Sequence, residues 1–521
     1  MGASTPLIFS GALIFVIFTA LGFGGMELIV HAALRKILVL KEGSDVWNMW
    51  KTMPVPIYTR FRIFNVTNPE GLANGEKAIL HEMGPYTYLQ DWEKEDITVD
   101  PEDDTIRYRM TKTYFFQPEL SAGSDDDVVT FINVILVASS HVASEIVQDE
   151  FMMSQMNDML AEKNERLTKT ATVRQILFDG VSFQAFVDLF NNPIVADMAA
   201  DMGLYLPDNI KDGKFSLLKN KNGTDDGWLV VKSGLESPDQ LGKIVSYNNE
   251  TFLKHWRNDT CNSINGTDGT MFPPFLTRDS IVHIFSPPIC RSFSAEYHSD
   301  QETQGLRTYR FIGSPKNFQA PKSNPDNWCF CKLQPNKTEV ESCPIDGLFN
   351  IWPCTEGAPI LASLPHFYGT EEWIKDGVEG LSPDFNKHNT MLDFHPLTGS
   401  PVEAWGRVQL SVELVQYYSM SLFANVRRAV VPILWIEEGS TLEGETLMGL
   451  QFIDGFINGF CYAKYIFMGI GIIMIIAGVV LLVLNGNKKK VMSPQPIVYG
   501  QDIEETSLDF GPTFTFTPNP E

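Results

Sequence analysis

Two long apolar runs, one near each end of the chain, constrain its fold more than any other feature. Leu7 to Val30 carries a single charged residue, Glu27, near its far end, and Tyr465 to Leu484 carries none. About 20 apolar residues, at a rise of about 1.5 Å each, span a hydrocarbon core of about 30 Å. The sequence therefore predicts two transmembrane helices, with the long intervening stretch folded on one side of the membrane.

The first run has one alternative, a cleaved signal peptide. No basic residue precedes it, no convincing small-residue cleavage site follows it, and it is longer than the apolar segment of a typical signal peptide. A retained anchor is the favoured interpretation.

Three lysines after the second run set the orientation. Lys488, Lys489 and Lys490 form a stop-transfer signal, which marks the cytoplasmic side. With two spans the N-terminus is then cytoplasmic too. Arg35 and Lys36 argue the other way, but the charge rule is weak for long translocated loops. The expected order is a cytoplasmic N-terminus (1–6), a transmembrane helix (7–30), an extracellular ectodomain (31–464), a second transmembrane helix (465–484) and a polar, disordered cytoplasmic tail (485–521).

N-glycosylation sequons support this topology, because all of them lie between the two runs. Such acceptor sites belong on the surface of domains that pass through the secretory pathway. The six candidate acceptors are Asn65, Asn222, Asn249, Asn258, Asn265 and Asn336.

Six of the seven cysteines cluster within 100 residues of each other: Cys261, Cys290, Cys329, Cys331, Cys343 and Cys354. An even cluster in an extracellular domain predicts a disulfide framework, with 15 connectivities left open. A zinc site is disfavoured because Cys329 and Cys331 form a C-x-C pair, whereas zinc ligands prefer two to four intervening residues. Cys461, just before the second run, is left over as a thiol at the membrane border.

The net charge of -24 excludes one class of partner. Binding to a nucleic acid backbone requires clustered Lys and Arg, and broad adhesion to anionic lipid requires the same. No nucleic acid partner is expected, and the charge is interpreted as a contribution to solubility.

The ectodomain shows mostly strand patterns. Ile106, Tyr108 and Met110 alternate with polar residues. In a second run, apolar Val408, Leu410, Val412 and Leu414 alternate with polar Gln409, Ser411 and Glu413. Such alternation predicts strands with one buried and one solvated face. A capped helix is predicted where Gly43-Ser44-Asp45 precedes Val46, Trp47 and Trp50.

One region, Val142 to Asp197, has a helical pattern instead. Val142, Ile146, Met153, Met156 and Leu160 recur on one face at helical spacing, and a second short helix around Phe183, Phe186 and Phe190 ends near Pro193. Flexible Met side chains suit an irregular apolar ligand, but the spacing alone favours ordinary core.

Catalytic motifs are absent from the sequence. It contains no G-x-S-x-G, H-E-x-x-H, Walker A or G-x-G-x-x-G pattern, so neither an enzyme nor a cofactor or metal is expected. His366 is interpreted as a buried, hydrogen-bonded structural histidine. The acid pairs Glu371-Glu372 and Glu437-Glu438 are interpreted as solvated edges.

Several segments together resemble the class B scavenger receptors, also called the fatty-acid translocase family, whose relatives include lysosomal integral membrane proteins and insect sensory neuron membrane proteins. The resemblance covers nearly the whole chain, in order. It is carried by Phe64-Asn65-Val66-Thr67-Asn68-Pro69-Glu70, Gly84-Pro85-Tyr86-Thr87-Tyr88, Ile264-Asn265-Gly266-Thr267-Asp268-Gly269, Phe272-Pro273-Pro274-Phe275, Cys290-Arg291-Ser292, Asn324-Pro325-Asp326-Asn327-Trp328-Cys329-Phe330-Cys331, Leu364-Pro365-His366-Phe367 and Val431-Pro432-Ile433-Leu434-Trp435.

The resemblance implies an α+β fold: two terminal transmembrane helices flank an antiparallel β-barrel core with short helices, an apical helical bundle and a hydrophobic tunnel. It also implies the disulfides Cys261–Cys329, Cys290–Cys354 and Cys331–Cys343. In relatives a lysine at the apex meets acidic ligands, whereas here acids interrupt the basic residues of that stretch. The residues expected at the ligand entrance are Ile146, Met153, Met156, Leu160, Lys163, Arg166 and Lys169.

The function implied is that of a receptor at the plasma membrane, rather than at an endosomal or lysosomal one. It binds hydrophobic ligands, such as lipids delivered by carrier proteins or lipoproteins, and passes them through the tunnel to the membrane. A homo-oligomer is compatible with this role. The alternative is a recognition or adhesion receptor for particles or cells that uses its surface and transports no lipid.

Overall fold

The computed structural model describes residues 4–146, 150–201, 206, 210–331, 343, 345–355 and 359–491. The chain divides into two compact units. One unit comprises Met1–Glu27 and Asn458–Glu521; its described residues are helical, and we call it the helical unit. The other, Leu28–Ile457, is the ectodomain.

Two helical stretches, Ser4–Ile37 and Gly444–Asn485, are long and apolar enough to cross a membrane. The first consists of α1 (Ser4–Ala20), a π-helical turn η1 (Leu21–Gly25) and α2 (Met26–Ile37). The second lies in α12 (Gly444–Val491), whose 48 residues extend for about 70 Å, more than twice the thickness of a hydrocarbon core. The helix therefore extends beyond the predicted span at both ends and includes the first residues of the predicted disordered tail (485–521), among them the three lysines.

Within the helical unit, the two spans approach closely at glycines. A Cβ atom on Gly11 would lie 2.7 Å from the carbonyl oxygen of Gly471, so only glycine allows this contact. The Phe18 and Phe467 rings stack at 4.4 Å. Lys464 donates a hydrogen bond of 3.0 Å to the Gly22 carbonyl, where the turn η1 departs from helical geometry.

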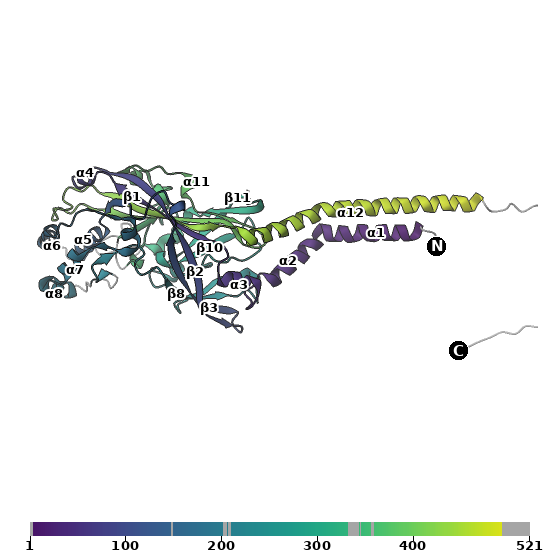
Figure 1. The fold of residues 1–521 in the computed structure, drawn as a ribbon, viewed down its shortest axis with the longest axis horizontal. Coiled ribbons are helices and arrows are strands. Elements are labelled where there is room, and N and C mark those ends of the chain that lie inside the picture. Colours follow the sequence, from purple (N-terminus) through teal and green to yellow (C-terminus); the bar gives the residue numbers. More distant parts are fainter. Residues whose placement is uncertain are drawn as a thin grey trace, which may run out of the picture. The chain divides into compact units, whose positions relative to one another are not determined.

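The ectodomain is built on one 14-stranded sheet, with the main order β10-β11-β12-β16-β17-β18-β1-β2-β3-β8-β9 (Figure 1). Every neighbouring pair along this order is antiparallel. The strands are β1 (Ile57–Val66), β2 (Ala78–Asp100), β3 (Thr105–Phe116), β8 (Thr224–Lys232), β9 (Ile244–Tyr247), β10 (Ile281–Ser286), β11 (Arg291–Thr303), β12 (Leu306–Gly313), β16 (Met391–Phe394), β17 (Pro401–Leu414) and β18 (Ala429–Thr441), with β13 (Leu348–Asn350), β14 (Ile360–Ser363) and β15 (Val378–Glu379) attached to this row.

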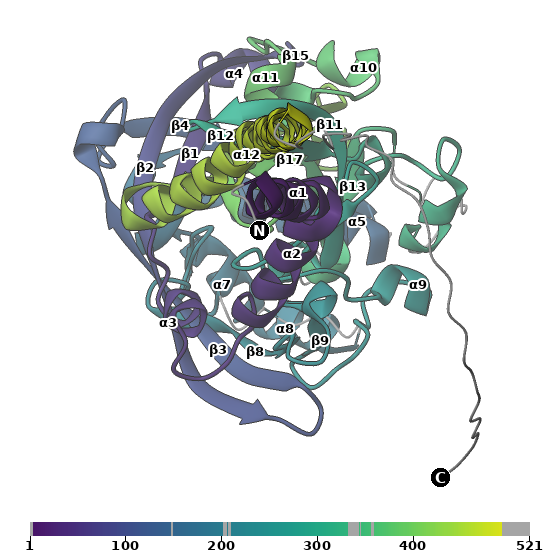
Figure 2. The same ribbon diagram turned by 90° about the vertical axis from the view of Figure 1, so that its right-hand side faces the viewer.

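A short segment, Gly266–Thr267, bridges the two outer strands of this order. Ile244 of β9 donates its backbone N–H to the Gly266 carbonyl (2.9 Å), and Phe285 of β10 donates to the Thr267 carbonyl (2.9 Å). Backbone hydrogen bonds thus continue from β9 through Gly266–Thr267 to β10. In Figure 2, β3, β8 and β9 lie at the lower side of the ectodomain, and β1, β2, β12 and β17 lie at the upper side. The predicted fold class, terminal apolar helices flanking a β-rich ectodomain with short helices, is confirmed.

Short helices gather at the end of the ectodomain opposite the first turns of α12 (Figure 1). We call α5, α6, α7 and α8 the apical helices. They are α5 (Val134–Ile146), α6 (Glu150–Glu162), α7 (Gln184–Phe190) and α8 (Pro193–Asp201), accompanied by β4 (Val128–Ile132), β5 (Thr168–Thr172), the π-helical turn η3 (Gln175–Asp179), β6 (Val181–Ser182) and β7 (Lys214–Phe215).

The predicted helical region Val142 to Asp197 is only partly helical. It starts inside α5, eight residues after that helix begins, and β5 and η3 interrupt it. Helix α5 begins where the Asn133 side chain accepts the backbone N–H of Leu136 (3.1 Å). Its first turn, Val134 to Val137, is apolar on every side, so it shows none of the periodicity that marks a helix in a sequence.

The remaining elements are short: α3 (Asp45–Lys51), α4 (Pro69–Ala73), η2 (Pro118–Leu120), η5 (Pro238–Gln240), α9 (Asp259–Asn262), η6 (Pro287–Ile289), η7 (Pro315–Asn317), η8 (Pro325–Phe330), η9 (Trp352–Cys354), η10 (Pro365–Phe367), α10 (Glu372–Lys375) and α11 (Phe385–His388). The capped helix predicted after Gly43 is α3, and the Ser44 hydroxyl accepts the Trp47 N–H at 3.1 Å.

The prediction of one wet face per strand holds for β3 but is wrong for β17. In β3, Ile106 and Tyr108 are buried and Arg107 is exposed. In β17, Gln409 and Ser411 are fully buried as well. The reason is that η10 covers this face, since Gln409 accepts the backbone N–H of His366 at 2.7 Å.

Candidate ligand cavity

The ectodomain contains a partly open cavity of about 1370 Å³. At one end it is lined by Val134, Ile135 and Ala138 of α5, which belong to the apical helices. At the other end it is lined by Leu442 and by Thr446, in the first turn of α12. The cavity therefore extends from the apical helices to the start of the helix that enters the membrane.

Alternate residues of the strands in the 14-stranded sheet supply most of the cavity wall, as the two-residue period of a strand requires. The apolar ones include Ile57 and Phe61 of β1, Met110 of β3, Val282 and Ile284 of β10, Leu392 of β16, Val408 and Leu410 of β17, and Ile436 of β18. A concave site of this size, lined mainly by apolar side chains, fits a hydrophobic small molecule.

An ion cluster lies on Glu437 of β18, and one of its members, Arg407, also lines the cavity. Its carboxylate contacts Arg407 (2.7 Å), Arg60 (3.0 Å) and Arg62 (3.7 Å). Burial alone raises the pKa of Glu437, but the charges of Arg407 and Arg62 and the hydrogen bonds from Arg60 and Arg407 outweigh it and hold the pKa below its usual value. The interpretation of Glu437 as a solvated edge is wrong, because its side chain is buried among three arginines.

A second buried cluster lies around His366. Its Nε2 atom is 2.5 Å from Glu82, and its Nδ1 atom accepts the backbone N–H of Ser382 at 3.0 Å. The His366 ring stacks on His388 at 4.4 Å, and Trp435 donates to the same Glu82 oxygen at 2.8 Å. These contacts match the interpretation of His366 as a buried structural histidine.

Those residues predicted at the ligand entrance whose side chains the structure describes do not line the cavity. Met153 and Leu160 of α6 are buried in the main hydrophobic core, and Met156 packs against that core. The side chain of Ile146 lies outside the described residues. The helical pattern thus identified core positions, and an entrance role for these side chains stays a prediction. The cavity is lined instead by the neighbouring helix α5, whose uniformly apolar start gave no signal.

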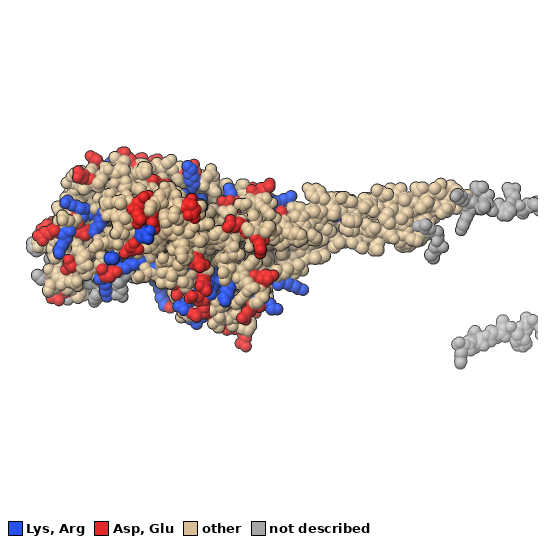
Figure 3. Space-filling model, in the orientation of Figure 1, with Lys and Arg blue, Asp and Glu red and all other residues tan. Residues whose placement is uncertain are grey.

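Acids engage two of the three predicted basic residues. Lys163 pairs with Asp188 at 3.2 Å, and Lys169 pairs with Glu165 at 2.9 Å and donates to the Ser182 carbonyl at 2.7 Å. Arg166 is exposed. Figure 3 shows both signs of charge interspersed over the face in view, including the end formed by the apical helices. This arrangement does not favour capture of an anionic ligand at the apex.

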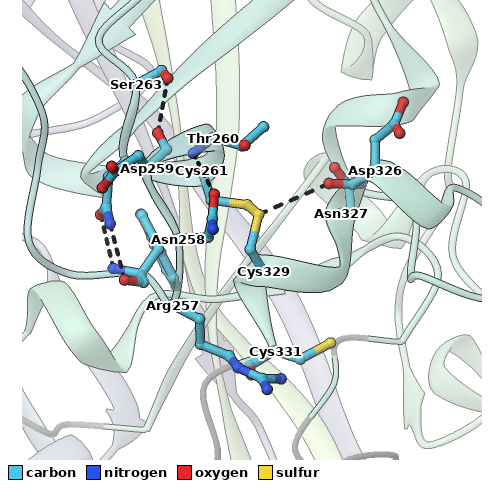
Figure 4. Close-up of a disulfide and its surroundings, with 12 residues drawn as sticks. Arg257, Asn258, Asp259, Thr260, Cys261, Ser263, Asp326, Asn327, Cys329 and Cys331 are labelled. Carbon is cyan, nitrogen blue, oxygen red and sulfur yellow. Dashed lines mark hydrogen bonds between the residues drawn. A yellow bond between two sulfur atoms is a disulfide. The ribbon is translucent and has the colours of Figure 1, made fainter.

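Two disulfides form in the structure, Cys261–Cys329 and Cys331–Cys343. Figure 4 shows the first, which joins α9 to η8, with the Cys329 sulfur directed at the Asp326 carbonyl. The sulfurs of Cys290 and Cys354 and a ring nitrogen of His255 lie within 4.8 Å of one another. The Cys290–Cys354 bond stays a prediction.

The described sequon asparagines lie at or near the surface. Asn222, Asn249, Asn258 and Asn265 are exposed, and Asn65 is half-buried. The Oδ1 atoms of Asn65 and Asn222 accept backbone N–H groups, from Thr130 (2.8 Å) and Tyr114 (2.9 Å). Because a glycan attaches through Nδ2, these contacts are compatible with glycosylation. Asn336 lies outside the described residues.

Fold and cavity together define a two-pass membrane protein whose β-rich ectodomain contains a mainly apolar cavity. The CD36 family model matches residues 9–482, and the chain belongs to the CD36 family. Its relatives include sensory neuron membrane protein 2 of Manduca sexta (31% identical, covering 91% of this chain and 92% of that protein) and sensory neuron membrane protein 1 of Apis mellifera (31%, 89% and 88%). Scavenger receptor class B member 1 of Bos taurus is 28% identical, over 88% of this chain and 86% of that protein. The family resemblance noted in the sequence is thereby confirmed.

Proposed function

We propose that this protein is a class B scavenger-type receptor of the plasma membrane. It takes a hydrophobic ligand from a lipid carrier protein or a lipoprotein at the apical helices and passes it through the cavity to the bilayer. The observation that carries the proposal is the extent of the cavity, whose lining runs from α5 to the first turn of α12.

The energetics favour such a route. Each CH₂ group kept out of water saves about 0.8 kcal/mol, so a mainly apolar path lowers the barrier to moving a long chain between carrier and membrane. The chain has no nucleotide-binding motif, and transfer therefore runs down the ligand's own gradient. The role is that of a receptor and conduit rather than an enzyme.

Blocking the lumen tests this proposal. Gly406 lines the cavity, and a Cβ atom there would have its nearest contact at 3.7 Å, so Gly406→Trp adds bulk to the lumen without a backbone clash. The matched control is Asp91→Trp on the exposed face of β2. We expect uptake of a fluorescent lipid by expressing cells to fall at least several-fold for Gly406→Trp and to stay unchanged for Asp91→Trp, at equal surface levels.

Equal uptake by both variants would favour the alternative, a recognition receptor that works through its surface. Retention of Gly406→Trp inside the cell is separated from blockage by measuring surface biotinylation, and the smaller Gly406→Leu then repeats the test.

A further inference from the structure

A row of polar side chains crosses the apolar wall of the cavity. It lies on four neighbouring strands and consists of Glu438 (β18), Thr59 (β1), Gln90 (β2) and Tyr114 (β3); we call it the polar row. Thr59 and Glu438 are directly paired across β1 and β18, and Gln90 and Tyr114 across β2 and β3. Glu438, Thr59 and Tyr114 line the cavity.

Hydrogen bonds hold one oxygen of Glu438 in place. Its Oε2 atom accepts from Gln90 Nε2 (2.7 Å) and from the Thr59 hydroxyl (3.3 Å). Gln90, which is buried, also donates to the Thr59 hydroxyl, and its own oxygen accepts the Trp92 indole N–H at 2.6 Å. The donors of Thr59 and Gln90 are thereby committed, and the carboxylate has a fixed orientation.

The other oxygen of Glu438 and the hydroxyl of Tyr114 have no hydrogen-bond partner among the residues the structure describes. No described Lys or Arg lies within ion-pair distance of Glu438 either. The arginines of the neighbouring strands, Arg60, Arg62 and Arg407, all contact Glu437 instead, which points to the opposite side of β18. Burial, followed by the charges of Glu438 and Asp226, raises the pKa of Tyr114, so its hydroxyl stays neutral.

A carboxylate in this position selects among lipids by their polar group. It accepts a hydrogen bond from a hydroxyl, and a hydrogen bond to a charged group is stronger than one between neutral groups. An ether or a hydrocarbon leaves it without a donor, and the anion of a fatty acid meets a like charge.

We propose that Glu438, oriented by Thr59 and Gln90, is a specificity-determining residue that binds the hydroxyl group of an uncharged lipid alcohol inside the cavity. This inference rests on the proposed function, because it takes the cavity as the ligand path. Lys112, which lines the same cavity 4.4 Å above the Trp92 ring, is the opposing candidate, since it would bind a carboxylate.

Three ligands with the same 18-carbon chain distinguish selection by Glu438 from selection by Lys112. They are 1-octadecanol, methyl octadecyl ether and stearate. Their binding is measured on the full-length protein in detergent, by displacement of a fluorescent lipophilic probe. For the wild type we expect octadecanol to bind roughly 10-fold more tightly than the ether, and stearate to bind more weakly than both.

The substitution Glu438→Gln reverses the polarity of the site. Gln90 and Thr59 both donate to the retained oxygen, so the new NH₂ group takes the cavity-facing position. We expect the preference for the alcohol over the ether to disappear and stearate binding to strengthen at least several-fold. Glu93→Gln, on the exposed face of β2, should leave all three affinities unchanged.

Each contrary result has a distinct meaning. If the alcohol and the ether bind equally to the wild type and to Glu438→Gln, the polar row does not select ligands, although the cavity still binds them. If stearate binds best and Lys112→Gln removes that preference, Lys112 is the selecting residue and the inference is wrong. If none of the three displaces the probe from the wild type, the cavity is not a ligand site and the proposed function fails as well.

Discussion

His366 and Glu82 meet at 2.5 Å, with the Ser382 N–H on the far side of the imidazole ring and Trp435 on the same carboxylate oxygen. Because Nδ1 accepts a hydrogen bond, the neutral ring carries its proton on Nε2 and donates it to Glu82. His366→Leu removes both contacts and leaves the half-buried Glu82 carboxylate with one hydrogen-bond donor fewer. We expect a loss of about 2–3 kcal/mol in unfolding free energy, measured by thermal unfolding in detergent. An unchanged midpoint would show that the pair does not stabilise the fold.

The neighbouring His388 makes stability depend on pH. Burial is the largest cause that lowers the pKa of His388 to about 4, whereas an unfolded histidine titrates near 6.5. Between pH 4 and pH 6.5 the unfolded chain therefore binds more protons than the folded one. The contribution of His388 to the unfolding free energy is fully present above about pH 6.5 and is lost as the pH falls toward 4.

The measurement for His388 is the thermal midpoint at pH 7.5 and pH 4.5. Between these two pH values, we expect the unfolding free energy of His388→Gln to fall by about 1–2 kcal/mol less than that of the wild type, so its midpoint should fall less as well. The exposed His81→Gln should behave like the wild type. Equal drops in all three proteins would mean that His388 does not carry the acid sensitivity.

The two disulfides differ in the size of the loop they close, 68 residues for Cys261–Cys329 and 12 for Cys331–Cys343. In the chain-entropy model these loops contribute about 4 and about 3 kcal/mol. Cys261→Ser should therefore lower the thermal midpoint more than Cys343→Ser. Peptide mapping without reduction should recover both pairs and the predicted Cys290–Cys354 link, whereas Cys329 joined to Cys331 would contradict the framework.

The topology predicts that glycans are confined to the ectodomain. Enzymatic deglycosylation should increase gel mobility, and replacing all six sequon asparagines by Gln should abolish that shift. A wild-type protein without glycan would contradict the extracellular placement of residues 31–464.

Features that depend on local pattern could be predicted from the sequence. The apolar runs gave the membrane helices, and Ser44 ahead of Trp47 gave the capped helix α3. The fold class followed from the family resemblance rather than from periodicity. By contrast, Val134 to Val137 is apolar throughout, so nothing in its pattern showed that α5 starts there and faces the cavity.

Glu437 and Glu438 show why the surroundings of polar side chains in the strands could not be predicted from the sequence. Adjacent residues of a strand point to opposite sides, and here both sides are covered. One side holds arginines that are distant in the chain, such as Arg60, and the other faces the cavity. Two consecutive acids normally indicate a solvated edge, and only the pairing of β18 with β1 and β17 shows otherwise.

Photoaffinity labelling tests the central claim, passage of ligand through the cavity, most directly. A long-chain lipid with a diazirine near its middle is supplied to expressing cells and photolysed during uptake, and the labelled peptides of the purified protein are mapped. The account predicts labels on cavity-lining residues of the sheet strands, such as Val408, Leu410 and Ile436, and their loss in Gly406→Trp. Labels confined to the outer surface of the ectodomain, and unchanged in that variant, would contradict it.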